Sequence, residues 1–224
     1  MKRVTRRNLS GFLGLVLAMA VSVAGAESDL CAPFEDSTVD ASVVEKMLAS
    51  ARDGHLYRID PSSSQVGFCV DSPVGRIEGR FADFVGGLSD IPAATDQQVM
   101  VTVNTASLRT GTPFIESRLK GEQFFDVGNY PRMQFVSRKF HWVNSSEAVL
   151  IGDLTLHGVT RQVGFHVRLI DKDQGSTPGE TARIQVKATT LISRAAFGLD
   201  ALSPVVSDDV SLCMSVEAVR YRAI

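Results

Sequence analysis

The feature that most constrains the fold is a pair of alternating segments that meet at His157-Gly158. One parity of the first segment carries Leu150, Leu154 and Leu156, and one parity of the second carries Val163, Phe165, Val167 and Leu169. Such alternation predicts two strands, each with one apolar face. Glycine accepts positive φ freely and histidine is enriched there, so His157-Gly158 suits the tight turns of β-hairpins. The segment from Leu150 to Leu169 therefore predicts an antiparallel hairpin.

Alternating segments of the same kind recur from Leu56 onward without a linker, which favours one domain. Their apolar positions are Tyr57 and Ile59; Val66, Phe68 and Val70; Ile77, Gly79 and Phe81; Val99, Val101 and Val103; Met133 and Phe135; Ile184, Val186, Ala188 and Ile192; Val210, Leu212, Met214 and Val216. Gly86-Gly87 is predicted as a turn. About eight strands with one apolar face each must join those faces in a sandwich or a closed barrel, and closure removes exposed edges.

The regular pattern lapses over residues 105–128, a long connection for a compact domain. Within it, Ile115 to Leu119 predicts a helical turn, and Phe124-Phe125 predicts an apolar plug. Long connections of this kind are often functional. Three cations in the same connection, Arg109, Arg118 and Lys120, are candidates for contact with an anionic head group, with plain solvation as the alternative.

Residues 1–26 have the three parts of a secretory signal peptide, in order. A basic head precedes an apolar run from Phe12 to Val23, and Ala24-Gly25-Ala26 follows. That run is shorter than the ~20 residues of a membrane-spanning helix, so we expect cleavage after Ala26 and no stable membrane insertion of the mature chain. The expected location is the periplasm. Arg6-Arg7 leaves the twin-arginine route open beside the general one.

Charge excludes one class of partner. Removing residues 1–26 takes away four positive charges and no negative ones, so 19 Lys and Arg remain against 25 Asp and Glu, a net of −6. A mildly acidic chain without basic clusters lacks the electrostatic footprint that nucleic-acid backbones require.

Residues 27–54 form a distinct extension, where Val39, Val43, Val44, Met47 and Leu48 recur at helical spacing before Gly54. This predicts a short amphipathic helix docked on the main domain.

Catalytic and metal-binding patterns are weak in this chain. The histidines, His55, His141, His157 and His166, are scattered, and no H-E-x-x-H or C-x-x-C spacing occurs. His157 is explained by its turn and His166 by an outward strand position. No serine lies in G-x-S-x-G, and Ser62 to Ser64 indicate a turn after Pro61. We therefore expect no enzyme, no metal site and no cofactor.

Five blocks of sequence resemble one known family, in its order. They are Tyr57-Arg58-Ile59-Asp60-Pro61; Gly79-Arg80-Phe81-Ala82-Asp83-Phe84; Phe124-Phe125-Asp126-Val127 with Tyr130-Pro131; Gly152-Asp153-Leu154-Thr155-Leu156-His157-Gly158-Val159-Thr160; and Ile192-Ser193-Arg194-Ala195-Ala196-Phe197-Gly198-Leu199. The chain is similar here to the YceI-like family of polyisoprenoid-binding proteins. The resemblance assigns residues 55–224 to a YceI-like domain. Ser63 stands where many relatives have a histidine.

The resemblance implies an all-β fold: an extended, lipocalin-like antiparallel barrel in the periplasm, whose tunnel holds an isoprenoid or similar amphiphile. It brings no catalytic motif. Strand parity then assigns the lining residues, which are Phe68, Val70, Phe81, Val101, Val103, Phe135, Leu154, Leu156, Phe165, Val167, Ile192, Leu212 and Met214. Inward apolar residues also occur in any filled core, so a packed stress or interaction protein is the alternative. An enzyme on a lipophilic substrate is less favoured, and the oligomeric state stays open.

The three cysteines predict one disulfide. An exported chain meets an oxidising compartment, and three cysteines leave one unpaired. Cys69 and Cys213 both fall on outward faces. With the last strand beside the first, they are expected on strands two apart, about 9 to 10 Å and beyond the reach of a disulfide. Cys31 is therefore the expected partner of Cys69 or Cys213.

Overall fold

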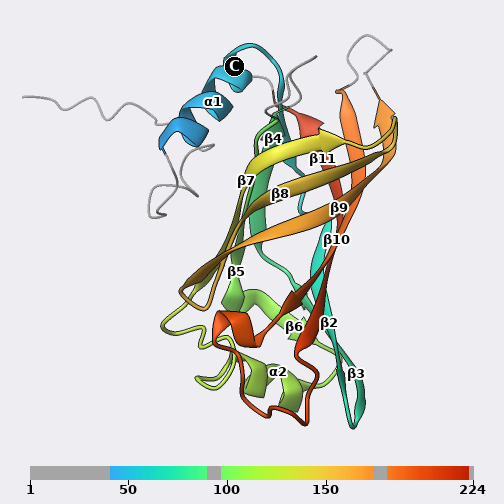
Figure 1. Ribbon diagram of the computed structural model, residues 1–224. Coiled ribbons are helices and arrows are strands. Elements are labelled where there is room, and N and C mark those ends of the chain that lie inside the picture. Colours follow the sequence, from blue (N-terminus) through green and yellow to red (C-terminus); the bar gives the residue numbers. More distant parts are fainter. Residues whose placement is uncertain (1–40, 90–96, 174–180, 222–224) are drawn as a thin grey trace, which may run out of the picture.

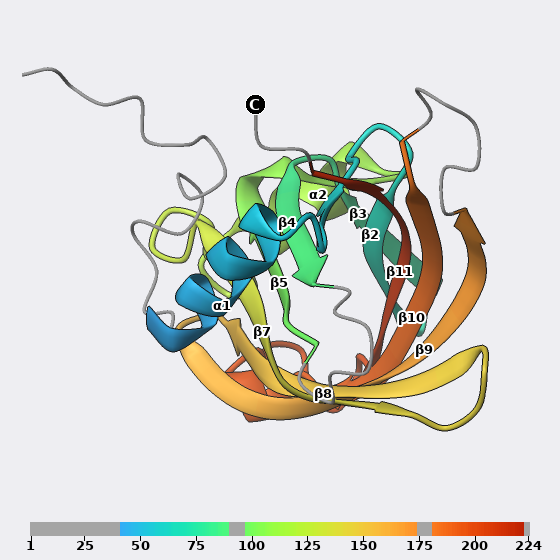
Figure 2. The ribbon, with the colours of Figure 1, turned by 90° about the horizontal axis from the view of Figure 1, so that it is seen from above.

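The computed structural model describes residues 41–89, 97–173 and 181–221, which form one antiparallel sheet with two flanking α-helices (Figure 1). The strands are β1 (Leu56–Ile59), β2 (Gln65–Ser72), β3 (Gly75–Phe81), β4 (Phe84–Ser89), β5 (Val99–Asn104), β6 (Leu108–Thr110), β7 (Arg132–Trp142), β8 (Glu147–Leu156), β9 (Val159–Asp173), β10 (Arg183–Ser193) and β11 (Asp209–Arg220). Neighbouring strands follow the order β1-β4-β5-β7-β8-β9-β10-β11, and a β1–β11 pairing closes this ring (Figure 2). The predicted eight-stranded barrel is confirmed.

The remaining strands lengthen one wall of the barrel. β2 continues along β11 where β1 stops, β3 pairs with β2, and β6 pairs with β3. The break between β1 and β2 is the predicted turn after Pro61, where Asp60 accepts hydrogen bonds from the backbone and hydroxyl of Ser62. The Ser64 hydroxyl then bonds both the carbonyl and the N–H of Glu217, which replaces the missing ladder partners.

The hairpin at His157-Gly158 has the predicted form. β8 and β9 pair from Leu156 opposite Val159 to Glu147 opposite Arg168, with only the dipeptide between them. His157 has φ +51° and Gly158 has φ +72°. Two successive positive φ angles define the primed turn that matches strand twist. The His157 ring also packs against Tyr130 in a tilted arrangement, with ring centroids 4.4 Å apart.

Helix α1 (Ala41–Arg52) lies on the outside of the barrel. Met47 and Ala51 are buried against Leu56 and Met100, which point outward from β1 and β5. Gly54, with φ +72°, ends the helix. Docking of the helix is therefore confirmed for these residues, while Val39, Cys31 and the signal segment lie outside the described residues. Within the described residues, neither helix has the length and hydropathy of a membrane span.

Two expectations about the strands are wrong. Gly86-Gly87 lies inside β4 and forms no turn, because both residues pair with β5. A Cβ at Gly86 would lie 2.6 Å from the Met100 carbonyl oxygen of β5. A glycine at this position therefore lets β4 and β5 approach closely. The placement of the cysteines is also wrong: β2 pairs directly with β11, with Cys69 opposite Ser211 and Cys213 opposite Gly67. The two thiols are diagonal neighbours on the outer wall, and within the described residues neither forms a disulfide.

The barrel interior is filled at one level and open at another. Phe135, Leu154 and Phe165 belong to one buried cluster, and the Phe135 and Phe165 rings meet edge to face at 5.2 Å. Open space lies toward the end where β8 and β10 finish and β11 begins, which is the lower end in Figure 1. Helix α2 (Pro113–Lys120) and the segment after β10 flank this lower end.

Candidate ligand-binding site

An apolar cavity of about 450 Å³ occupies the lower end of the barrel. Its walls come from β2, β3, β7, β8, β10 and β11, from α2, and from the two loops beside it. The lining residues are Phe68, Val70, Ile77, Phe81, Phe114, Ile115, Arg118, Leu119, Phe124, Phe125, Met133, Leu156, Ile192, Arg194, Leu199, Leu202, Val206, Val210 and Leu212. Arg118 and Arg194 are the charged side chains among them. A volume of this size with so few polar groups is typical of sites for apolar ligands.

Three aromatic rings form one wall of the cavity. Phe68 lies 6.1 Å from Phe81 and 5.6 Å from Phe125, and Phe81 meets Phe125 edge to face at 5.7 Å, all between centroids. The Phe68 ring lies over Gly79, where an added Cβ would come within 2.4 Å of it. A glycine in the middle of β3 thus makes room for the ring. The predicted apolar plug is confirmed for Phe125, which is buried in this wall.

Arg194 holds the segment that forms the opposite wall. Although only 6% exposed, it has no carboxylate partner at salt-bridge distance in the described residues. Its guanidinium instead donates to the backbone carbonyls of Leu199, Ala201, Val206 and Ser207. The planar, multidentate donor set of arginine suits this task, because it satisfies several carbonyls from one side chain. Arg194 is thus committed to the loop and not available to a ligand.

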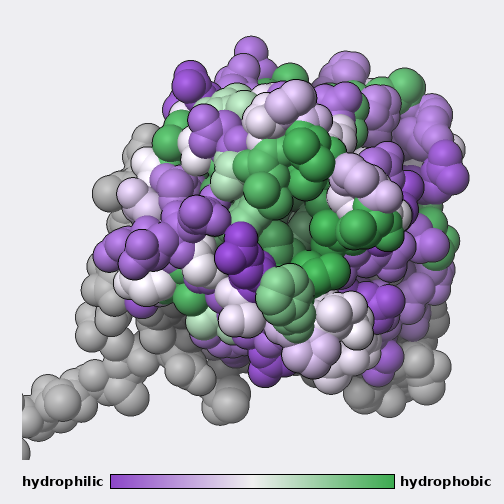
Figure 3. All heavy atoms as spheres, turned by 90° about the horizontal axis from the view of Figure 1, so that it is seen from below, coloured by the Kyte–Doolittle hydropathy of each residue, from purple (hydrophilic) through white to green (hydrophobic). Residues whose placement is uncertain are grey.

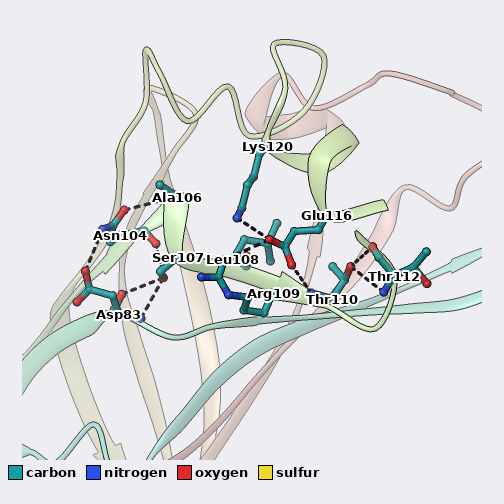
Figure 4. A network of polar contacts seen from close by, with 10 residues as sticks. All are labelled: Asp83, Asn104, Ala106, Ser107, Leu108, Arg109, Thr110, Thr112, Glu116 and Lys120. Atoms are coloured by element: carbon teal, nitrogen blue, oxygen red, sulfur yellow. Dashed lines mark hydrogen bonds and ion pairs between the residues drawn. The ribbon is translucent and has the colours of Figure 1, made fainter. Parts of the chain in front are cut away.

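Helix α2 is attached to β6 through one carboxylate, Glu116 (Figure 4). Glu116 accepts from Lys120 Nζ at 2.8 Å, from Arg109 Nη1 at 3.1 Å and from the Thr110 N–H at 3.3 Å. The hydrogen bond from Lys120 and the other donors hold the pKa of Glu116 below its ordinary value. A second group, Asp83, Asn104 and Ser107, fixes the turn before β6. These contacts place one face of α2 over the cavity.

The structure separates the expected lining residues into two groups. The residues that line the cavity are Phe68, Val70, Phe81, Leu156, Ile192 and Leu212. Those that lie in the packed cluster beyond it are Val101, Val103, Phe135, Leu154, Phe165 and Val167, with Met214 half-buried against that cluster. Parity is therefore right about direction for these positions, but direction alone does not distinguish a lined cavity from a filled core.

The expected head-group cations also divide. Arg109 and Lys120 are both paired with Glu116, whereas Arg118 lines the cavity. In the described part of the chain, no ion pair or side-chain hydrogen bond involves Arg118. The described residues also contain no cluster of three or more His, Cys, Asp or Glu side chains that could hold a metal.

Several lining residues were not expected from the sequence. Ile77, Met133 and Val210 have the parity of their lining neighbours, and that signal was present in the sequence. Phe114, Ile115, Leu119, Leu199, Leu202 and Val206 come from α2 and the loop after β10, where no alternation marks an inward face. The walls built from irregular segments were therefore invisible to strand parity.

Comparison with known proteins agrees with this geometry. Residues 57–218 match the model of the YceI-like domain. The chain belongs to the YceI-like family. The UPF0312 protein of Serratia proteamaculans is 34% identical over 145 residues, which is 64% of this chain and 74% of that protein. The family match covers the barrel and leaves α1 outside it.

Solved structures show the same fold. Burkholderia cenocepacia BcnA superposes with a TM-score of 0.64 at 21% identity, covering 71% of this chain and 98% of BcnA. A polyisoprenoid binding domain from Saccharophagus degradans, implicated in plant cell wall breakdown, superposes with a TM-score of 0.56 at 20% identity. It covers 73% of this chain and 98% of that domain. The YceI-like barrel is thus shared well beyond the range of sequence similarity.

Proposed function

We propose that this YceI-like protein binds a polyisoprenoid or another long-chain amphiphile and carries or sequesters it in the periplasm. The observation that carries the proposal is the apolar cavity of about 450 Å³ inside the lower end of the barrel. A filled YceI-like barrel would have no such space. The polyisoprenoid binding domain of Saccharophagus degradans has the same fold and supports an isoprenoid as the ligand class. The signal-like segment before Ala26 supports the periplasmic location.

A binding role is favoured over catalysis by the character of the cavity wall. Its charged side chains are Arg118 and Arg194, and Arg194 is occupied by backbone carbonyls. General acid–base or nucleophilic chemistry needs groups that exchange protons or attack near neutral pH, which arginine does not do. Arg118 is suited to a different task, the binding of an anionic head group at the edge of the cavity.

Two neighbouring residues of β10 provide a matched test. Ile192 lines the cavity, whereas Leu191 faces outward and is 62% exposed. Protein purified from its native periplasm is extracted with organic solvent, and the extract is analysed by mass spectrometry. Wild type and Leu191→Trp should both release a long-chain amphiphile. Ile192→Trp should release little, because the indole fills the space, and the variant should remain folded by circular dichroism.

Two results would contradict the proposal. Wild-type protein without any co-purifying lipid would favour the alternative, a stress or interaction protein with a packed barrel. Equal lipid in Ile192→Trp and wild type would place the ligand outside this cavity. Chemical conversion of the extracted lipid by the purified protein would instead support an enzyme. For the head group, Arg118→Gln should weaken retention of an anionic amphiphile, while Arg80→Gln, on the outer face of β3, should not.

A further inference from the structure

The mouth of the cavity is surrounded by apolar side chains that face solvent. Phe114 at the start of α2 and Leu202 in the loop after β10 both line the cavity, yet they are 73% and 54% exposed. Val205 in the same loop is 61% exposed. Seen from below, hydrophobic residues gather around a hollow at this end of the molecule (Figure 3). We call Phe114, Leu202 and Val205 the apolar rim.

Exposed apolar side chains that cluster around an opening mark an interaction surface, because isolated ones are normal but a gathered set is costly in water. From the apolar rim and its continuity with the cavity we propose that this end of the barrel docks on a lipid bilayer. An amphiphile leaving a bilayer through this mouth would pass from one apolar environment to another without crossing water. Lipid exchange and docking then use the same opening.

Charge and backbone favour a lipid surface over a protein partner. Arg118 lies at the cavity without an ion-pair partner among the described residues, whereas Arg109 and Lys120 are both paired with Glu116. Basic residues beside an apolar surface strengthen binding to anionic membranes. A peptide that added a strand to the sheet would need the free edge of β6. There the Thr110 N–H is bonded to Glu116, and the Leu108 carbonyl accepts from Arg109.

Vesicle flotation tests the inference directly. Protein purified from a periplasmic extract is mixed with vesicles of phosphatidylcholine, alone or with phosphatidylglycerol, and the bound fraction is measured. Wild type should float with the vesicles, and more strongly with those that contain phosphatidylglycerol. Burying one large apolar side chain is worth more than a tenfold change in partition. Val205→Asp and Phe114→Asp should therefore each reduce binding by roughly tenfold or more.

Val143→Asp is the matched control, because Val143 is 60% exposed and follows β7 at the other end of the barrel. It should float like wild type. Equal flotation of Val205→Asp, Phe114→Asp and wild type would overturn the inference, as would wild-type protein that carries lipid but floats with neither vesicle. The second result would indicate a protein partner at the mouth. Docking through the rim by protein that carries no lipid would support the inference while refuting the proposed function.

Discussion

Phe165 lies 2% exposed in the packed part of the barrel, with its ring edge-on to Phe135. Because it does not line the cavity, Phe165→Ala should remove core packing and not ligand contact. We expect a loss of about 3 to 5 kcal/mol in the free energy of unfolding. Lipid retention by the folded variant should remain near that of wild type. Denaturant unfolding and lipid extraction measure the two quantities on the same preparation.

His166→Ala is the control for that experiment, because His166 follows Phe165 in β9 and its side chain is exposed on the outer face of the strand. It should leave both stability and lipid content unchanged. If Phe165→Ala keeps the wild-type free energy of unfolding but loses its lipid, the ligand reaches the level of this ring. The cavity then extends farther into the barrel than the structure shows.

Arg194 stabilises the loop after β10, because its guanidinium donates to four backbone carbonyls of that loop. Arg194→Met preserves much of the apolar stem but leaves those buried acceptors unpaired, at a cost of about 3 kcal/mol or more. Thermal unfolding should show a large drop, and Arg194→Lys should recover only part of it, since one ammonium does not match the fork geometry. Arg168→Met, whose side chain is 67% exposed, should change little. An Arg194→Met variant as stable as wild type would refute this role.

At the scale of single elements, the hairpin turn is the feature with the clearest backbone requirement. Gly158 has φ +72°, and a Cβ there would lie 2.6 Å from Tyr130 Cε1. Gly158→Ala should therefore destabilise the fold by about 1 to 2 kcal/mol from the left-handed conformation alone, with the contact to Tyr130 adding to it. Gly164→Ala in β9 is the matched control, because a Cβ there meets nothing within 4 Å. Comparable losses in the two variants would rule out the turn as the cause.

The sequence predicted the elements whose own residues show a periodic pattern. The predictions were wrong where the structure of a segment depends on the element that packs beside it. The β8–β9 hairpin and the helix within residues 115–119 were anticipated because periodicity and turn chemistry are local. Gly86-Gly87 has the same local signature as a turn, yet it lies in β4 because it pairs with β5, where the close approach of the Met100 carbonyl leaves no space for a Cβ at Gly86. The turn after Pro61 was predicted, but the pairing of β2 with β11 beyond it was not, because no pattern within either strand reveals which strand is its neighbour. The same limit hid the α2 and loop walls of the cavity.

At the scale of the whole molecule, the barrel combines a packed level with an open one. The packed cluster around Phe135 and Phe165 keeps the strands in register. Helix α2 and the loop held by Arg194 enclose the open level. The open level leaves room for an apolar ligand where a filled barrel would contain side chains. The family fold thus sets the scaffold, and the irregular segments shape the cavity.

The N-terminal extension meets this scaffold through α1, and we predict that a disulfide fixes it there. Cys69 and Cys213 are diagonal neighbours, a relation that places Cα atoms about 7 to 8 Å apart, at the limit of a disulfide. Cys31 precedes α1 by ten residues, a span of up to about 36 Å. Helix α1 packs on β1, and β1 pairs with β11, which carries Cys213. Cys31 is therefore the expected partner of one barrel cysteine.

Peptide mapping under non-reducing conditions, on protein recovered from its native cells without added reductant, checks this pairing. One linked peptide should join Cys31 to Cys69 or Cys213, and the other thiol should react with an alkylating reagent. Cys31→Ser should leave both barrel thiols reactive and lower the free energy of unfolding by about 2 to 4 kcal/mol, because the extension is no longer tethered. A linked peptide that joins Cys69 directly to Cys213 would show that the strands adjust to bring the diagonal pair within reach, and Cys31 would then be the unpaired cysteine.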